Sequence, residues 1–477
     1  MTIESDIARP VPRTWGWPVP GGGRAGHVEA GVRFAGTTSQ VCGLFPFAVS
    51  SGADVHGVPI GRHMHTAEPI GLDPAHWLRS GLVSNTGIWV QGQPGIGKSS
   101  ITKRLLTGLV GFGMRAVIPG DVKGEYTPLI HALDGAVWKL GRGLHALNPL
   151  DAGPLLPALT AASGAERERL AETIRARRLS LLEALITIVR RSEPTVTERR
   201  LLGAALDTAT TSMATQPVIP DVLAVLSTGG GMLPAIAATA TATEYRRAAR
   251  ELTNTLGLLC EGAIRGIFDR PSTIVLDADT PALSLDISAL DGDEDEVVAA
   301  AMLCSWAWTA GLVDAATTGP HPRNVVQVQD ELWRALRVAP GLVEKSDRIT
   351  RLGRHRGVVS IQITHSLDDL EALPTEADRA KARGLASRTS VLLLGGMAEK
   401  ELDGLRRITS LTEGEAALIT SWAAPPTWHS GRIHPGRGKY LIKSGQRIGL
   451  PVALTLTATE ADLYDTDTAF RPNEVDR

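Results

Sequence analysis

The segment from residue 92 to residue 99 has the composition of a loop that binds phosphate groups. It reads Gly-Gln-Pro-Gly-Ile-Gly-Lys-Ser and fits the P-loop pattern G-x-x-x-x-G-K-[ST], in which backbone N–H groups and the lysine cradle phosphates. Glycines permit backbone angles and close approaches that a Cβ atom would block. We predict that a nucleotide is held by Gly92, Gln93, Pro94, Gly95, Ile96, Gly97, Lys98, Ser99 and Ser100.

The residues on either side of this loop predict the elements that position it. Residues 87–91 are an apolar run typical of a short buried strand, and residues 99–111 carry apolar side chains at helical spacing. The N-terminus of a helix attracts anions through its unpaired N–H groups and its dipole. The order strand, glycine-rich loop and helix therefore predicts an anion site.

Two adjacent acids follow a second apolar run and resemble the other half of a nucleotide-hydrolysing site. Residues 325–329 predict a strand that ends at Asp330 and Glu331. We expect this strand to be a parallel neighbour of the P-loop strand, so that Asp330 and the Ser99 hydroxyl hold Mg²⁺. Glu331 then orients or deprotonates the attacking water. The alternative is a surface pair of acids that opens a helix.

A third strand, predicted over 358–364, ends in a polar pair. Thr364 and His365 lie where a side chain can sense the terminal phosphate. The alternative is that they cap the helix predicted to begin near Asp368.

Arginines are candidates for stabilising negative charge in a transition state, a role often filled by a neighbouring subunit. Arg351 and Arg354 belong to a basic segment just before the strand at 358–364. A simple surface cluster is the alternative. Arg437, which lies between two glycines, is a second and less favoured candidate.

Asp121 and Glu125 follow a strand predicted over 114–119. We expect this strand to lie beside the P-loop strand, which would place both acids on the catalytic edge of the sheet. Glu125 then positions water or meets a neighbouring arginine. Alternatively, Glu125 opens a helix predicted over 125–133, where an acid in the first turn is favoured.

The whole pattern predicts an α/β core interrupted by an all-helical insertion. Strands and helices alternate from residue 84 to about 150 and resume near 273, which implies a mostly parallel sheet covered by helices. Residues 155 to about 268 show helical periodicity with almost no strand signal. Further strands are predicted over 136–140, 273–276, 283–287 and 389–394, and a strongly apolar helix over 296–316.

The expected domain organisation has five segments. Residues 1–80 form an N-terminal lobe or arm, 81–154 the first part of the P-loop core, 155–270 the helical insertion, 271–470 the second part of the core, and 471–477 a frayed tail.

Arginines decorate the long amphipathic helix predicted over 166–191. They contact DNA or a neighbouring subunit, or they form a solvated face that nearby glutamates balance. The arginines are Arg167, Arg169, Arg175, Arg177, Arg178, Arg190 and Arg191, and the glutamates are Glu166, Glu168, Glu172 and Glu183.

Composition narrows the class of protein. With 477 residues, 43% of them apolar, the chain is globular and too long for one simple core. A net charge of -2 gives no global attraction to nucleic acid or anionic membranes. Cys42, Cys260 and Cys304 lack metal-site spacing, which favours a reducing compartment. No apolar run approaches the ~20 residues of a membrane span, so we expect a cytoplasmic protein that reaches the inner face of the cell membrane through partners.

Taken in order, these motifs resemble the HerA/FtsK superfamily of hexameric P-loop motors, and within it the TraC-like ATPases of conjugative type IV secretion systems. Beyond the P-loop and the acids, residues 121–126 are similar to the family's D-x-K-G-E-Y, residues 147–151 to I-N-P-L-D, and residues 411–415 to L-T-x-x-E. The likeness covers roughly residues 55–460. The family usually has Gln where this chain has His365, and its N-terminal region is usually larger.

The resemblance implies a RecA-like core that assembles into a hexamer and binds ATP and Mg²⁺ between subunits. It further implies a motor that energises transfer of DNA or protein through a membrane secretion or conjugation channel, with channel components as partners. A soluble HerA-like DNA translocase is the alternative motor, with DNA as its partner. A scaffold that binds ATP without hydrolysing it is the third hypothesis, and the intact Lys98, Asp330 and Glu331 argue against it.

Overall fold

The computed structural model describes residues 55–465 with several gaps, at 213–215, 263, 276–279, 319–322, 345–356, 368–370, 424–433 and 435. Residues 1–50 and 51–477 form separate units, and the described residues all belong to the second. Most of the predicted N-terminal lobe, the arginine segment with Arg351 and Arg354, and the predicted tail therefore lie outside the described residues.

One mixed sheet forms the centre of the described part, with the strand order β2-β1-β11-β10-β9-β3-β8-β7-β4-β6-β5. The strands from β9 to β5 are parallel, and the others are antiparallel. Their bounds are β1 (Val58–His63), β2 (Pro69–Leu72), β3 (Gly87–Gln91), β4 (Arg115–Asp121), β5 (Ala136–Lys139), β6 (Ala282–Asp286), β7 (Val325–Gln329), β8 (Val358–Thr364), β9 (Val391–Leu394), β10 (Lys439–Lys443) and β11 (Leu450–Leu454).

Two hydrophobic cores cover the two faces of this sheet, because successive side chains of a strand point to opposite faces. In β3, Ile88 and Val90 pack into one core, whereas Trp89 packs into the other. The first core includes α2 (Pro74–Arg79), α3 (Lys98–Gly111), α4 (Thr127–Ala132) and α18 (Ala458–Tyr464). The second includes α11 (Asp295–Thr318), α12 (Leu332–Leu336), α15 (Glu376–Arg388), α16 (Glu399–Arg406) and α17 (Glu413–Ala423).

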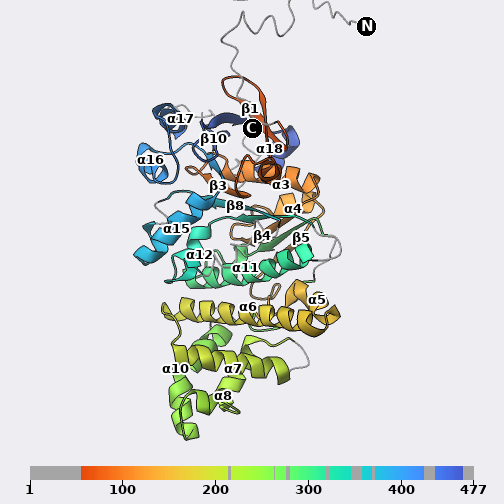
Figure 1. The fold of residues 1–477 in the computed structure, drawn as a ribbon, viewed down its shortest axis with the longest axis vertical. Helices are drawn as coiled ribbons and strands as arrows, with labels where there is room; N and C mark the ends of the chain where they lie inside the picture. The colour runs from red at the N-terminus through yellow and green to blue at the C-terminus, as the bar shows by residue number, and fades with distance from the viewer. Residues whose placement is uncertain are drawn as a thin grey trace, which may run out of the picture. The chain divides into compact units, whose positions relative to one another are not determined.

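The predicted all-helical insertion separates β5 from β6. It contains η1 (Gly153–Leu155), α5 (Leu156–Ala161), α6 (Gly164–Arg190), α7 (Val196–Ser212), α8 (Ile219–Thr228), α9 (Leu233–Ile236) and α10 (Ala242–Glu261), and η2 (Ser288–Leu290) follows β6. Figure 1 shows α6 lying along α11, with α7, α8 and α10 beyond it. The insertion thus packs on the second core and leaves the opposite face to α3 and α4.

The expected α/β fold with a mostly parallel sheet is confirmed, with one strand wrongly predicted. Thr273 and Ile274 lie outside any strand. Thr273 instead pairs with the loop after β5, because its amide donates to the Ala146 carbonyl and its hydroxyl accepts from the Ala146 amide. Its backbone is therefore fastened to a loop rather than to a neighbouring strand.

The statement that no apolar run approaches the length of a membrane span is wrong for α11. Residues Asp295–Ala315 are long and apolar enough to cross a membrane, but 83% of that apolar window is buried inside the protein. The apolar character of α11 follows from its place between the sheet and α6, where both sides meet apolar neighbours.

The arginines of α6 form ion pairs and buried hydrogen bonds with neighbouring elements. Arg175 pairs with Asp207, Arg177 with Asp314, Arg190 with Glu198, and Arg191 with Glu296. Arg178 is buried and donates to the Leu150 carbonyl. The balancing acids come mostly from other elements, and of the glutamates within α6 that the sequence indicated, Glu172 lies 3.6 Å from Arg175.

Candidate active site

The P-loop connects β3 to α3 at the carboxyl edge of the parallel strands. Gly95 and Gly97 have backbone φ angles of 80° and 99°, which residues other than glycine rarely adopt. A Cβ atom at Gly92 would lie 3.2 Å from the Cα of Gly395, so the loop also approaches the segment after β9 closely. The Gln93 amide donates to the Gly396 carbonyl at 3.0 Å and fixes this approach.

Strand β10 supports the P-loop from behind. The Tyr440 hydroxyl donates to the Gly97 carbonyl at 2.6 Å, and the Gly438 amide donates to the Ile96 carbonyl at 2.9 Å. Tyr440 is fully buried, and burial raises the pKa of its phenol, so it stays a donor. These bonds hold the two carbonyl groups toward β10.

Lys98, at the start of α3, is buried at the centre of the site. Its Nζ donates to the carbonyl oxygens of Gly92 at 2.7 Å and Gln93 at 3.1 Å. It also lies 2.8 Å from Nδ1 of His365. An ammonium group only donates hydrogen bonds, so Nδ1 of His365 must accept here.

His365 connects Lys98 to Glu331 through its two ring nitrogens. Because Nδ1 accepts, the proton of the neutral ring resides on Nε2, which lies 3.1 Å from Oε1 of Glu331. The geometry therefore selects one tautomer. His365 follows β8, which runs between β3 and β7, and this position lets its ring reach both neighbours.

Glu331 is 5% exposed and begins α12 in a left-handed backbone conformation with φ of 51°. Its carboxylate also accepts from Lys123 at 2.6 Å and from the indole of Trp333 at 2.6 Å. Burial acts to raise its pKa, but the hydrogen bonds from His365 and Lys123 outweigh burial and lower the pKa to about 2. Glu331 does open a helix, yet it is a buried side chain and not a surface acid.

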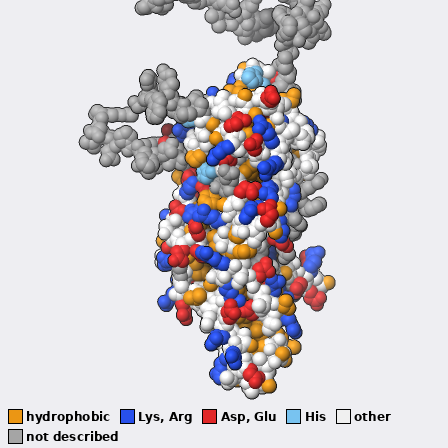
Figure 2. All heavy atoms as spheres, turned by 90° about the vertical axis from the view of Figure 1, so that its left-hand side faces the viewer, with side chains coloured by type: hydrophobic (Ala, Val, Ile, Leu, Met, Phe, Trp, Pro, Cys, Tyr) orange, Lys and Arg blue, Asp and Glu red, His pale blue; other side chains and the backbone are white. Residues whose placement is uncertain are grey.

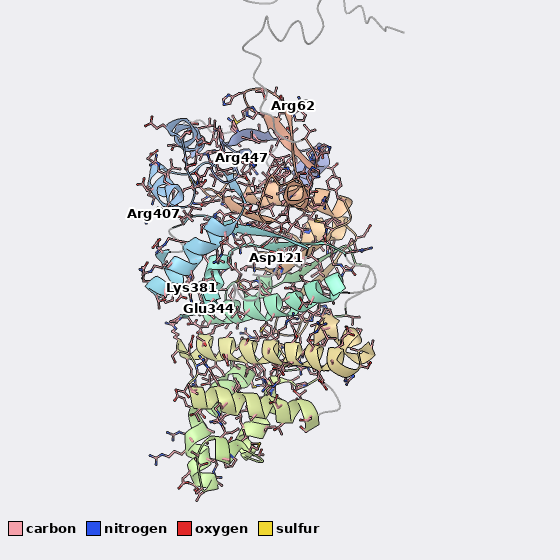
Figure 3. All side chains as sticks on the ribbon, in the orientation of Figure 1. Arg62, Asp121, Glu344, Lys381, Arg407 and Arg447 are labelled. Atoms are coloured by element: carbon pink, nitrogen blue, oxygen red, sulfur yellow. The ribbon has the colours of Figure 1, made fainter. Side chains whose placement is uncertain are left out.

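Asp330 and Asp121 accept hydrogen bonds from the segment between β4 and α4. Asp330 accepts from the Tyr126 hydroxyl at 3.0 Å and from the Glu331 amide at 2.9 Å. Asp121 accepts from the amides of Glu125 and Tyr126. Desolvation, together with nearby carboxylates, raises the pKa of Asp330 to about 6 and that of Asp121 to about 7. Figure 3 shows Asp121 in the sheet-bearing part of the chain, outside the insertion.

Glu125 contacts the P-loop helix. Its Oε2 accepts from the Ser99 hydroxyl at 3.0 Å. The alternative was that Glu125 opens a helix. The helix α4 begins two residues later, at Thr127, so Glu125 lies before it.

The strand order differs from the expected one. β8 separates the P-loop strand β3 from β7, and β7 in turn separates β8 from β4. Neither the strand before Asp330 nor the strand before Asp121 is therefore a direct neighbour of β3, and both expectations were wrong. The side chains nevertheless meet, because all these parallel strands end at the same edge of the sheet.

Arg437 is the arginine candidate within the described residues. It is exposed in the turn before β10, next to Gly438, whose amide contacts the P-loop of the same chain. The structure thus places Arg437 beside the P-loop in cis, whereas Arg351 and Arg354 lie outside the described residues.

Two of the motifs that resemble the family, residues 411–415 and 147–151, contain side chains whose hydrogen bonds join elements of the fold. Glu415 accepts from the Thr412 amide and hydroxyl and from the buried Lys443, so it caps α17 and ties it to β10. Asn148 accepts from the Leu150 amide and donates to the Pro217 carbonyl, which fastens the core to the insertion.

Sequence reasoning did not single out Lys123, Trp333 and Tyr440 as members of this site. Lys123 belonged to a quoted motif, and Trp333 follows Glu331 by two residues, but contacts across strands decide their partners. Tyr440 follows the glycine pair 436 and 438 in sequence, but only the fold brings its hydroxyl to Gly97.

The residues fit a nucleotide with Mg²⁺. A Cβ at Gly95 would meet no atom within 4 Å, so open space borders the loop where phosphates would enter. Hydroxyl and carboxylate oxygens, the ligands Mg²⁺ prefers, are supplied by Ser99 and the nearby acids. Within the described ranges, no group of three or more His, Cys, Asp or Glu side chains forms a complete metal cage.

Comparison with known proteins supports the fold. No family model matches the sequence, and no curated protein matches it. The structure of VirB4 from Thermoanaerobacter pseudethanolicus superposes with a TM-score of 0.65 at 20% identity, covering 86% of this chain and 100% of that one. The bacterial conjugative coupling protein TrwB, without its first 70 residues, gives a TM-score of 0.50 at 12% identity, covering 87% and 92%. TrwB in complex with ADP and Mg²⁺ gives 0.49 at 13% identity, with the same coverage.

At these identities, the likeness establishes a shared fold. The predicted resemblance to HerA/FtsK-type P-loop proteins is therefore confirmed at the level of the fold, and the chain has the large mostly parallel sheet and helical segments of VirB4.

Proposed function

We propose that this chain is an ATP-hydrolysing motor that energises a conjugative or type IV secretion-type transfer of DNA or protein. The observation that carries the proposal is the connected path from Lys98 through His365 to Glu331, which joins the P-loop to the acid at the end of β7. The likeness to VirB4 supports the choice of a secretion motor among P-loop proteins.

Each residue has a role that follows from its chemistry. Lys98 neutralises phosphate charge, and exchanges its bonds to Gly92 and Gln93 for phosphate oxygens. Ser99 and nearby acids would hold Mg²⁺, which would supply positive charge next to the transferred group. Glu331 orients the attacking water and accepts its proton. Backbone N–H groups of the P-loop position the phosphates, which is the largest contribution in such sites.

Glu331 must exchange a hydrogen bond before it can accept a proton from water. Its two oxygens accept from Lys123, His365 and Trp333, and these bonds lower its basicity. When Lys98 turns to a phosphate, Nδ1 of His365 loses its donor. The phosphate is thereby linked to the state of Glu331 through one imidazole ring.

In this proposal the working form is a homo-oligomer, by the family resemblance a hexamer, with channel components as partners at the inner face of the cell membrane. The choice of ATP over GTP also follows from the resemblance. Four of the arginines singled out along α6 and at its end, Arg175, Arg177, Arg190 and Arg191, give the DNA-translocase alternative little support, because each is paired with an acid. Figure 2 shows acidic and basic side chains interspersed over the face in view, without a field of one sign.

Steady-state ATP hydrolysis by the purified chain, with and without single- and double-stranded DNA, tests the proposal. A secretion motor without its channel is expected to turn over slowly and independently of DNA. Strong stimulation by DNA that falls steeply with salt would instead favour the DNA translocase. A chain that binds ATP without any turnover would overturn both and favour the scaffold.

A further inference from the structure

The two oxygens of the Glu331 carboxylate have donors of different kinds. Oε1 accepts from Lys123 at 2.6 Å and from His365 at 3.1 Å, and these residues follow β4 and β8. Oε2 accepts from the indole N–H of Trp333 at 2.6 Å, and Trp333 belongs to α12, which begins directly after Glu331. One oxygen therefore meets groups from other strand ends, and the other is held from its own helix.

Trp333 is the donor that an anionic nucleotide disturbs least. An indole has a single N–H donor, no acceptor and no charge. Phosphate oxygens compete for the ammonium of Lys123, and they compete for Lys98, which donates to His365. The bond from Trp333 to Oε2 is therefore expected to persist while the donors on Oε1 exchange.

The indole ring is itself held by a neighbouring cation. The guanidinium of Arg337 lies 4.5 Å from the centre of the Trp333 ring, which is a cation–π arrangement. Arg337 also donates to Asp295, the first residue of α11, at 2.8 Å. The long α11, whose apolar window is 83% buried, thus fixes the arginine that stacks on the indole.

The backbone at Glu331 supports the same arrangement. Its φ of 51° lies in the left-handed region, which a residue other than glycine keeps only where its surroundings fix it. The chain turns here from β7 into α12, and across this turn the carboxylate of residue 331 reaches the indole of residue 333.

The hydrogen bonds of the carboxylate also show what the indole leaves open. A carboxylate offers about four acceptor sites, two on each oxygen. Among the hydrogen bonds of the described residues, both sites of Oε1 and one site of Oε2 are used. Because the indole takes one site of Oε2, it determines the direction of the other. A water that donates to Glu331 at that site is then oriented by Trp333.

We propose that Trp333 is a positioning residue that holds Glu331 in the orientation that binds the attacking water, and that Arg337 and Asp295 keep the indole in place. The proposal rests on the proposed function, because it requires Glu331 to act on water during ATP hydrolysis. It adds α12 and the start of α11 to the elements that support the site.

The test compares ATP hydrolysis by the full chain with and without the indole N–H. Trp333→Phe keeps an aromatic ring for Arg337 but removes the donor to Oε2. We expect kcat to fall about 10- to 100-fold, the scale for one hydrogen bond to a charged group. KM and the affinity for a non-hydrolysable ATP analogue should stay near wild type, because the lost bond orients Glu331 and not the P-loop. Trp308→Phe, at an α11 tryptophan that packs edge-on against Trp138, is the matched control and should leave kcat unchanged.

A double variant separates positioning of Glu331 from general support of the fold. Glu331→Gln lacks the base, so adding Trp333→Phe to it should lower the remaining single-turnover rate by less than about 2-fold. A merely structural contribution would lower the rate equally in both backgrounds. Arg337→Met removes the stacked cation and should lower kcat about 2- to 5-fold, the scale of one exposed cation–π contact.

Thermal unfolding midpoints are measured for each variant. Wild-type kcat in a folded Trp333→Phe, a loss confined to KM, or an equal loss in the Glu331→Gln background would overturn this inference and leave the proposed function intact. If Trp333→Phe melts early, Arg337→Met is measured in the same two backgrounds, and an equal loss in both, or no loss in either, would overturn it. A wild-type chain that binds the analogue but hydrolyses no ATP would overturn the proposed function together with this inference.

Discussion

His365 shows at the scale of single residues how the site differs from its motif. At sequence level it was a candidate phosphate sensor or helix cap, and its position in the family is usually Gln. In the structure its ring accepts from Lys98 and lies within hydrogen-bond reach of Glu331 on its other side. A neutral amide has the same pair of functions, one acceptor and one donor.

Replacement of His365 should therefore depend on hydrogen bonding and not on ring chemistry. We expect His365→Gln to keep most of the ATP hydrolysis rate, because its amide can connect Lys98 to Glu331. His365→Leu should lose roughly 100-fold, the scale of one lost donor in an active site. Steady-state ATP hydrolysis by the two variants checks this. Equal rates would contradict a role in hydrolysis for the hydrogen bonds that connect Lys98 to Glu331.

Lys98 is the residue that we propose to contact the phosphates. Lys98→Ala should abolish hydrolysis and weaken ATP binding roughly 10- to 100-fold, since charged hydrogen bonds contribute about 1.5–3 kcal/mol each. Equilibrium binding of a fluorescent ATP analogue measures the second effect. Lys381→Ala is the matched control, because Lys381 lies on α15 in an exposed pair with Glu344, both labelled in Figure 3. Unchanged ATP hydrolysis in Lys98→Ala would contradict the assignment of residues 92–99 as a P-loop.

Individual elements of the core were readable from the sequence where local composition decided them. β3 and β8 have the predicted bounds, because each is an apolar run bounded by polar or turn-forming residues. The strand at Thr273 was wrongly predicted because one backbone and one side-chain hydrogen bond with Ala146 replace strand pairing, and such bonds depend on a loop far away in sequence. The same reason hid the contact of Lys123 with Glu331.

The hairpin β10–β11 and α17 are joined by a buried ion pair that a motif comparison alone would assign to function. Lys443 and Glu415 side chains are 2% and 7% exposed and lie 2.8 Å apart. Glu415→Ala leaves the ammonium of Lys443 buried without this partner, which should cost about 3–5 kcal/mol of unfolding free energy. Urea unfolding measures the loss, and the exposed Glu376→Ala should change it far less. A small effect in both would contradict the structural role.

The same pair predicts how stability depends on pH. Burial acts to raise the pKa of Glu415, but its bonds from Lys443 and from the Thr412 and Gly449 amides lower it below the usual value. A carboxylate with a lowered folded pKa stabilises the protein above its unfolded pKa of about 4.3, and this contribution is lost as the pH falls through the folded value. The stability difference between wild type and Glu415→Gln should therefore shrink below about pH 4. A constant difference would contradict the pair.

At the scale of the whole described unit, strand order was beyond sequence reasoning. Local runs predict that a strand exists, whereas its neighbours depend on crossovers and packing. β8 therefore lies between β3 and β7, although it follows both in sequence, and it brings His365 between Lys98 and Glu331. The helical insertion was predictable because its long periodic helices contrast with the strand pattern on both sides.

The proposed function requires that the site joined by Lys98, His365 and Glu331 hydrolyses ATP. Hydrolysis by the Glu331→Gln variant, measured beside wild type with ATP-analogue binding as a control, tests it most directly. We predict a loss of at least ~100-fold in turnover, the usual scale for a catalytic base, with binding retained. Unchanged turnover in Glu331→Gln would contradict the claim and leave a nucleotide-binding protein whose acid at the end of β7 serves structure alone.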